Sequence, residues 1–240
     1  SLAEMDSLIV LCIYTGAKID KEKYGLKPVY DGRLLIKVLN LSVWSMLHAF
    51  ISVAPWFLFF VAIEHLGKTE LAISNITRSV SAIFFVIANS FAVTTGSLVS
   101  NAIGARARNE LFPICHKILK LGYAVGIPFV VVTLLCNRWI VSFYTDNELL
   151  IELAFAPFVV MLLNYTFALP GYVYLNAVGG TGKTKITFLF QVTTTCVYLV
   201  YLYWLSFCIK ASLSLYLTAE YLFVILLALQ SIIYLKSKHY

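Results

Sequence analysis

Two ionisable side chains, Arg78 and Glu220, stand inside long apolar stretches of this 240-residue sequence. If the two stretches are helices that start near Leu71 and Leu213, both side chains lie about 10 Å from those ends, at a rise of 1.5 Å per residue. A charge at such a depth in a bilayer costs about 2.5–3.5 kcal/mol, so it normally faces the protein interior and has a partner. Glu220 or Glu64 can neutralise Arg78, and Glu220 is preferred because the depths match.

This charge pair has two interpretations, a structural link between helices or a substrate-binding or proton-linked site. Asn75 is three residues before Arg78 and shares a helix face with it. Asn164 and Tyr165 are further polar candidates inside an apolar stretch. Glu4 lies about 11 residues, or roughly 16 Å, above the cytoplasmic edge of its helix, which would place a carboxylate near the middle of a membrane.

Other polar side chains in the apolar stretches are expected to serve packing. We expect His48 to be a packing residue with its hydrogen bonds satisfied, and Gln191, Asn89 and Asn176 to donate hydrogen bonds between helices. Aromatic residues of the same stretches could instead line an adaptable apolar pocket: Trp44, Trp56, Phe57, Phe59 and Phe60, or Tyr198, Tyr201, Tyr203, Trp204 and Phe207.

Helix bends and close helix contacts are also predicted. A proline within a helix removes one hydrogen bond and permits a bend. The glycines of Gly122-x-x-x-Gly126 let a second helix approach closely. The prolines inside apolar stretches are Pro55, Pro128, Pro157 and Pro170.

The elements that must position these side chains are membrane-spanning helices. The sequence is 60% apolar and only 12% charged, with a mean hydropathy of +0.86. A bilayer core about 30 Å thick requires about 20 apolar helical residues. Six segments meet that length, so we predict an all-α integral membrane protein with a six-helix bundle: about 41–62, 71–98, 118–138, 153–176, 188–208 and 215–235.

The positive charge is distributed unevenly between the two sides of this bundle. If the segments alternate across the membrane, one side receives most of the 18 Lys and Arg residues. The other side has only Lys68, Arg138 and Lys210. By the positive-inside rule the basic side, with the carboxyl terminus, is cytoplasmic. The net charge of +6 therefore reports topology, and we expect no nucleic-acid partner.

Enzyme chemistry is not favoured. Ala177–Thr184 matches a loose phosphate-binding loop, but such a loop follows a buried strand, whereas membrane segments flank this one. The five cysteines and four histidines show no metal-ligand spacing, so we expect no metal or cofactor. An integral membrane transferase would need clustered His, Asp or Ser residues, and the histidines are dispersed.

The chain organisation follows from these segments. Residues 1–15 resemble the end of a preceding transmembrane helix, and 16–40 are polar and are expected to form a cytoplasmic connector between two lobes. Residues 41–240 form the six-helix transmembrane lobe.

Three local patterns resemble the multidrug and toxic-compound extrusion (MATE) family of the multidrug/oligosaccharidyl-lipid/polysaccharide exporter superfamily. His65–Ala72 is similar to an outer turn, Ser97–Ala105 to a Leu-Val-x-x-x-x-Gly-Ala signature, and Asn176–Thr184 to a Gly-x-Gly turn. All three occur in the order and on the sides that the family requires. The resemblance implies the carboxyl-terminal lobe of a twelve-helix transporter, whose amino-terminal six-helix lobe lies outside this chain.

The resemblance also implies a function and its partners. The expected function is secondary active multidrug efflux by Na⁺ or H⁺ antiport with alternating access, in the bacterial plasma membrane. Membrane lipid and amphipathic or cationic small molecules would be its partners. The alternative is a lipid-linked oligosaccharide flippase, for which a cationic cavity is expected and which Arg78 supports weakly. Family acids in the seventh and tenth helices are replaced here by residues near Ser52 and by Asn164 and Tyr165, so this lobe departs from the usual coupling pattern.

Overall fold

The computed structural model describes residues 2–18, 31–64, 66–209 and 211–237. The chain divides into two compact units, residues 1–40 and 41–240. The first unit contains α1, Leu2–Lys18. Residues 19–30 of the expected connector lie outside the described residues.

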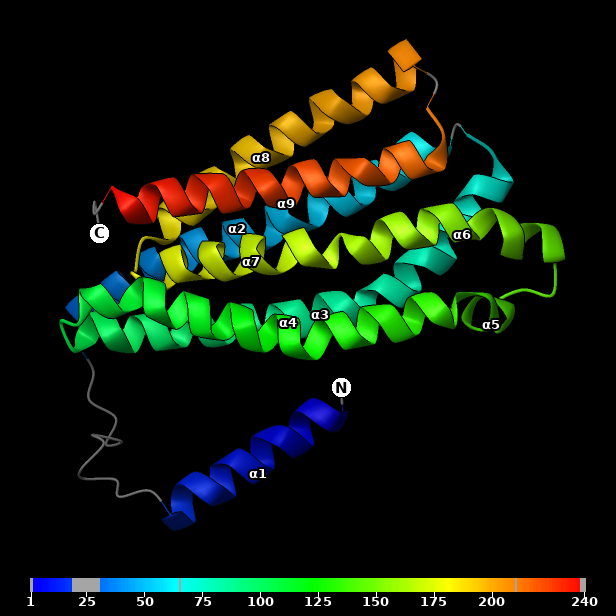
Figure 1. Cartoon of the computed structure of the whole chain (residues 1–240). Helices are drawn as coiled ribbons and strands as arrows, with labels where there is room; N and C mark the ends of the chain where they lie inside the picture. Colours follow the sequence, from blue (N-terminus) through cyan, green and yellow to red (C-terminus); the bar gives the residue numbers. More distant parts are fainter. Residues whose placement is uncertain (1, 19–30, 65, 210, 238–240) are drawn as a thin grey trace. The chain divides into compact units, whose positions relative to one another are not determined.

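The second unit is a helical bundle, and the described residues contain no strand (Figure 1). Its helices alternate along the chain with short turns. They are α2 (Gly32–Glu64), α3 (Lys68–Gly104), α4 (Leu111–Leu135), α5 (Asn137–Ser142), α6 (Glu148–Leu163), α7 (Tyr165–Gly180), α8 (Thr184–Trp204) and α9 (Leu213–Lys236). A 3₁₀ turn, Arg108–Glu110, precedes α4, and a π-helical turn, Leu205–Ile209, follows α8.

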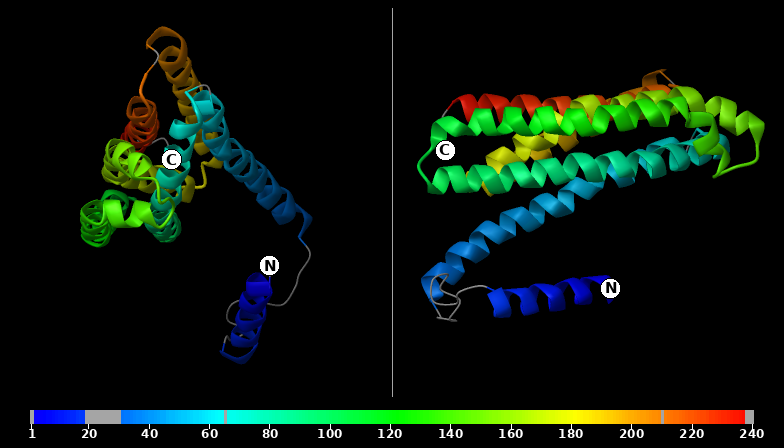
Figure 2. Two further views of the ribbon diagram at one scale, coloured as in Figure 1. Left: turned by 90° about the vertical axis from the view of Figure 1, so that its right-hand side faces the viewer. Right: turned by 60° about the horizontal axis from the view of Figure 1, so that its bottom comes forward.

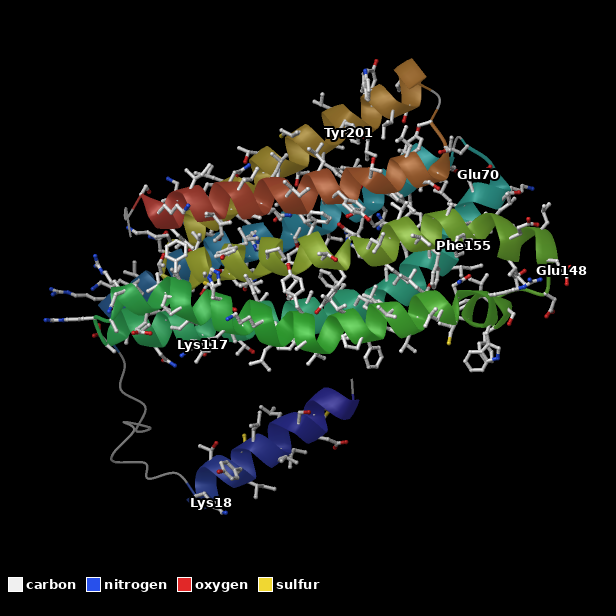
Figure 3. All side chains as sticks on the ribbon, in the orientation of Figure 1. Lys18, Glu70, Lys117, Glu148, Phe155 and Tyr201 are labelled. Carbon is white, nitrogen blue, oxygen red and sulfur yellow. The ribbon has the colours of Figure 1, made fainter. Side chains whose placement is uncertain are left out.

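Six helical stretches are long and apolar enough to cross a membrane, so this is a multi-pass membrane protein. Figure 3 shows Glu70 and Glu148 at one end of the bundle and Lys117 toward the other, as expected for alternating crossings. The six stretches are Gly32–Glu64, Lys68–Gly104, Arg108–Leu135, Glu148–Gly180, Thr184–Phe207 and Leu213–Lys236.

Several helices extend beyond the predicted apolar segments. The first was expected to start at residue 41, yet α2 begins at Gly32 because Asp31 caps it. The Asp31 carboxylate accepts hydrogen bonds from the amides of Arg33 and Leu34 at 2.9 and 3.2 Å. The residues 32–40, expected in the connector, are therefore helical. Hydropathy detects the length that lipid covers and does not detect a helix that continues into a polar region.

Helix α7 is the central element, since it packs against α3, α4, α8 and α9. Figure 2 shows α3, α4, α7 and α9 running roughly side by side. Glycines permit the closest approaches: a Cβ on Gly180 would lie 2.5 Å from the carbonyl oxygen of Gly96. The Oγ atom of Ser100 lies 2.9 Å from the carbonyl oxygens of Gly96 and Gly180, which share its one hydrogen.

The fourth span is broken at Asn164, between α6 and α7. Pro170 has no amide hydrogen, which leaves the carbonyl of Thr166 without its helical donor. The hydroxyl of Tyr123 donates to that carbonyl at 2.7 Å. The hydroxyl of Tyr221 donates to the carbonyl of Val160, which also accepts the amide of Asn164 at 3.3 Å. Tyr123 thus satisfies a backbone group that lipid could not.

The Gly122-x-x-x-Gly126 pair lies at the contact between α4 and α7. A Cβ on Gly122 would meet Leu169 at 2.7 Å, and one on Gly126 would overlap the ring of Tyr165. The two glycines therefore make room for side chains of α7, as a packing motif does.

Candidate functional site

Arg78 and Glu220 form an ion pair inside the bundle. Arg78 Nη2 donates to Glu220 Oε1 at 2.6 Å, and the exposed fractions of the two side chains are 3% and 12%. Tyr198 donates its hydroxyl to the same oxygen at 3.2 Å. The pair joins α3 to α9, and Tyr198 brings in α8. Both hydrogen bonds use Oε1, so Oε2 is available to a proton or a cation.

Aromatic rings of α2 surround the guanidinium. The Cζ atom of Arg78 lies 3.9 Å from the ring centre of Phe59, 4.6 Å from that of Trp56 and 5.2 Å from that of Phe60. A guanidinium within about 6 Å of an aromatic ring is attracted by the negative ring face, more strongly when both are desolvated. Among the described residues the buried Nε atom of Arg78 has no hydrogen-bond partner, so these rings provide part of its stabilisation.

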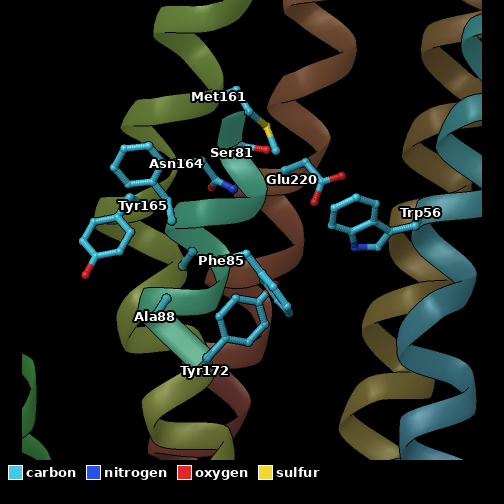
Figure 4. Close-up of a pocket in the computed structure, with 11 residues that line it drawn as sticks. Trp56, Ser81, Phe85, Ala88, Met161, Asn164, Tyr165, Tyr172 and Glu220 are labelled. Atoms are coloured by element: carbon cyan, nitrogen blue, oxygen red, sulfur yellow. The ribbon is translucent and has the colours of Figure 1, made fainter. Parts of the chain in front are cut away.

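Glu220 lines two neighbouring cavities. The smaller, of about 50 Å³, also has Trp56, Ser81, Asn164 and Tyr172 in its wall. Figure 4 shows the Glu220 carboxylate pointing toward Trp56, with Asn164 and Ser81 at the same level of the bundle. This cavity has room for one water molecule or a small cation.

The larger cavity, of about 130 Å³, lies between α2, α3, α7, α8 and α9. Its wall combines aromatic rings with amide, imidazole and carboxylate groups. The polar members are His48, Ser52, Asn89, Asn176, Gln191 and Glu220, and the ring-bearing members are Trp56, Phe85, Tyr172 and Phe223. Such a mixture is typical of a site for an amphipathic small molecule.

The structure brings Asn164 into the site but gives Tyr165 a packing position. Asn164 Oδ1 is buried beside the smaller cavity and has no hydrogen-bond partner in the part of the chain that the structure describes. Tyr165 contributes its ring to that wall, while its hydroxyl donates to the carbonyl of Gly122 at 2.9 Å. Figure 4 shows this hydroxyl turned away from Glu220.

The remaining predicted site residues lie elsewhere. Glu64 ends α2 and is exposed, so it does not provide the counter-charge of Arg78. Asn75 is exposed although Arg78 is buried, and it lines neither cavity of Glu220. Glu4 belongs to α1, and its side chain is outside the described residues.

The predicted packing roles of four polar residues are not what the structure shows. His48 Nε2 is buried without a partner. Gln191, only 3% exposed, makes no hydrogen bond within the described residues, and the same holds for the side chain of Asn89. Asn176 Nδ2 donates to the carbonyl of Tyr172 in its own helix, at 3.0 Å. All four side chains line the larger cavity, so they face open space where a hydrogen-bond acceptor on a neighbouring helix was expected.

Two residues of the site were missed by sequence reasoning in these roles. Tyr198, fully buried, contacts Glu220, and Tyr172 lines both cavities. They are two of fifteen tyrosines, and no local pattern distinguishes them. Among the described residues no three His, Cys, Asp or Glu side chains lie together as a metal site would require.

The fold and the site together define a lobe of a multi-pass membrane protein with a buried charge pair beside polar cavities. The chain belongs to the MatE family, whose sequence model matches residues 45–205. No curated protein matches the chain significantly in sequence.

Solved structures are similar in fold. A structure described as "MATE in the bent conformation" superposes with a TM-score of 0.73 at 17% identity, covering 82% of this chain and 44% of that one. A MOP superfamily transporter from Pyrococcus furiosus, described as having a binding pocket of reverse polarity, and an outward-facing multidrug resistance MATE transporter both give TM-scores of 0.69 at 17% identity. Each covers 82% of this chain and 43% of the other. The chain thus spans less than half the length of these proteins.

Proposed function

We propose that this chain is one lobe of a secondary active exporter that moves amphipathic or cationic small molecules across the membrane in exchange for Na⁺ or H⁺. The observation that carries the proposal is Glu220, a carboxylate within the bundle that lines two cavities. A carboxylate there binds a proton, a metal cation or an organic cation in competition, and such competition is what antiport requires.

Glu220 acts in this proposal through its two oxygens. Arg78 and Tyr198 hold Oε1, so a proton or cation at Oε2 weakens the attraction between α3 and α9. A cationic substrate that displaces the ion contacts the same oxygen and the ring of Trp56. Loading and release of Glu220 would then accompany the opening of the cavity to either side.

The proposal includes a partner lobe and an orientation. The matched region covers only 43–44% of these structures, so an amino-terminal six-helix lobe would form the other wall of the pathway. We place the complete protein in the bacterial plasma membrane, with the basic turns and the carboxyl terminus in the cytoplasm. We propose transport and not catalysis as its activity.

The flippase alternative receives less support from this site. A flippase of this kind is expected to need a cationic cavity, for which Arg78 was weak support, and Arg78 is paired with Glu220 at 2.6 Å. An anionic lipid-linked substrate would have to break that ion pair before Arg78 could bind it.

The test is dye efflux from cells that express the chain together with its amino-terminal lobe. The Na⁺ and proton gradients are collapsed separately. Ethidium export should stop when one of them is collapsed and continue when the other is, and the gradient that stops it identifies the coupling ion. Glu220→Gln should lower gradient-driven export at least tenfold, since a neutral amide cannot exchange a proton. Glu152→Gln, an exposed acid at the start of α6, is the matched control.

Ethidium export that persists in Glu220→Gln would remove Glu220 from the mechanism. No export under any gradient, with the protein present in the membrane, would contradict multidrug antiport and favour the glycolipid flippase.

A further inference from the structure

The larger cavity contains a buried amide with no partner. Gln191 of α8 is 3% exposed, lines this cavity and makes no hydrogen bond within the described part of the chain. A carboxamide has two N–H donors and one acceptor oxygen. Buried polar groups in proteins are nearly always hydrogen-bonded, so a buried amide that remains unpaired beside a cavity points to a missing ligand.

Further hydrogen-bonding groups without partners face the same cavity. His48 Nε2 is buried and unpartnered, and the side chain of Asn89 makes no hydrogen bond within the described residues. Asn176 uses Nδ2 for its own helix, which leaves Oδ1 available. These groups come from α2, α3, α7 and α8, so the cavity gathers donors and acceptors from four helices.

The side of the cavity away from Glu220 carries no charged group and favours a neutral ligand group. Its carboxylate, Glu220, is already paired with Arg78. The groups without partners are amides and an imidazole. Aromatic rings of Trp56, Phe85 and Phe223 form the apolar part of the wall. Rings provide a flat surface for the apolar face of a ligand, while the amides bind hydroxyl or carboxamide groups directionally.

We propose that the larger cavity binds the uncharged headgroup of an amphipathic substrate, one that carries hydroxyl or carboxamide groups, through Gln191 and Asn89. This inference rests on the proposed function and deepens it. Cationic groups engage Glu220, and neutral polar groups engage the amide side of the same cavity. The transporter therefore accepts neutral amphipaths as a distinct substrate class.

The test is probe binding to the purified complete transporter, without any ion gradient. Two probes share one alkyl chain and one fluorophore, and differ in a glucoside or a trimethylammonium headgroup. Gln191→Leu keeps the volume but removes the hydrogen bonds. Glucoside binding should weaken on the order of tenfold, the factor expected for one hydrogen bond to a buried polar group. Trimethylammonium binding should be unchanged.

The control is Gln230→Leu on α9, the same chemical change outside this cavity. Gln230 is hydrogen-bonded to Thr193 and Thr194, and its replacement should leave the binding of both probes unchanged.

Thermal unfolding gives a second readout. Gln191→Leu should not lower the melting temperature of the ligand-free protein, because it removes a buried amide that has no partner. If the Gln191→Leu variant does not accumulate in cells, Asn89→Leu is tested in its place, since Asn89 is at an exposed helix position. It should weaken glucoside binding in the same way.

Unchanged glucoside binding in both variants would overturn the inference, as would equal loss of both probes. A lower melting temperature with unchanged binding would assign Gln191 to a hydrated structural site and also overturn it. Transport is measured separately in proteoliposomes. Selective loss of glucoside binding without gradient-driven transport of either probe would contradict the proposed antiport and leave this inference standing.

Discussion

At the scale of residues, the Arg78–Glu220 pair combines stabilisation with reactivity. Arg78 is enclosed by Phe59, Trp56 and Phe60, and Glu220 faces open space on one side. The rings hold the Arg78 guanidinium in place, so the Glu220 carboxylate is the member of the pair that can bind a ligand. A buried pair also makes each partner depend on the other, because a lone buried charge is far more costly than a pair.

This dependence predicts a particular pattern in a double-mutant cycle. Arg78→Met and Glu220→Leu should each destabilise the folded protein by about 3–5 kcal/mol, since each leaves one buried charge unpaired. The double variant should be close to the original stability, because both charges are gone. Temperature-resolved gel filtration of the detergent-solubilised protein measures this. Additive losses in the double variant would contradict the coupling.

At the scale of elements, α2 and α7 have opposite roles. Helix α7 packs against α3, α4, α6, α8 and α9. Helix α2 buries only Pro55, Phe59 and Ile63, and it meets the bundle largely through aromatic contacts such as Trp44 with Phe188, at 5.5 Å between ring centres. Because α2 supplies the rings around Arg78, a movement of α2 changes the environment of the charge pair directly.

The contact between α3 and α7 near Gly180 is predicted to tolerate no added atom. Gly180→Ala would place a Cβ 2.5 Å from the backbone oxygen of Gly96, and overpacking of this kind costs about 1–3 kcal/mol. Gly179→Ala is the matched control, since its Cβ would meet Thr187 at an ordinary 3.7 Å. Melting temperature and export should fall for Gly180→Ala only. Equal effects of the two variants would mean that helix propensity, and not contact, governs this turn.

At the scale of the whole molecule, the bundle separates charge along its length. Glu70 and Glu148 lie at one end, and Lys117 lies toward the other (Figure 3). The topology assigned from this asymmetry predicts which turns a membrane-impermeant reagent reaches.

In a background without the five native cysteines, Asp146→Cys should react with an impermeant maleimide in intact cells. Ser237→Cys should react only after the cells are opened, since it follows α9 on the basic side. Labelling in the reverse order would invert the topology. It would also require a different direction for the proposed transport.

The sequence by itself determined the membrane-spanning class, the six crossings and the resemblance to the MatE family, because hydropathy and turn motifs are local properties. It also indicated that Arg78 needs a partner, since the cost of a charge in lipid does not depend on the fold. Matching depths already favoured Glu220 over Glu64 as that partner, and the ion pair confirms the choice. The ring cage of α2 and the unpaired amide of Gln191 required the tertiary structure. These features depend on how helices distant in sequence are rotated and tilted against each other, and a period of 3.6 residues leaves that rotation open when nearly every face is apolar.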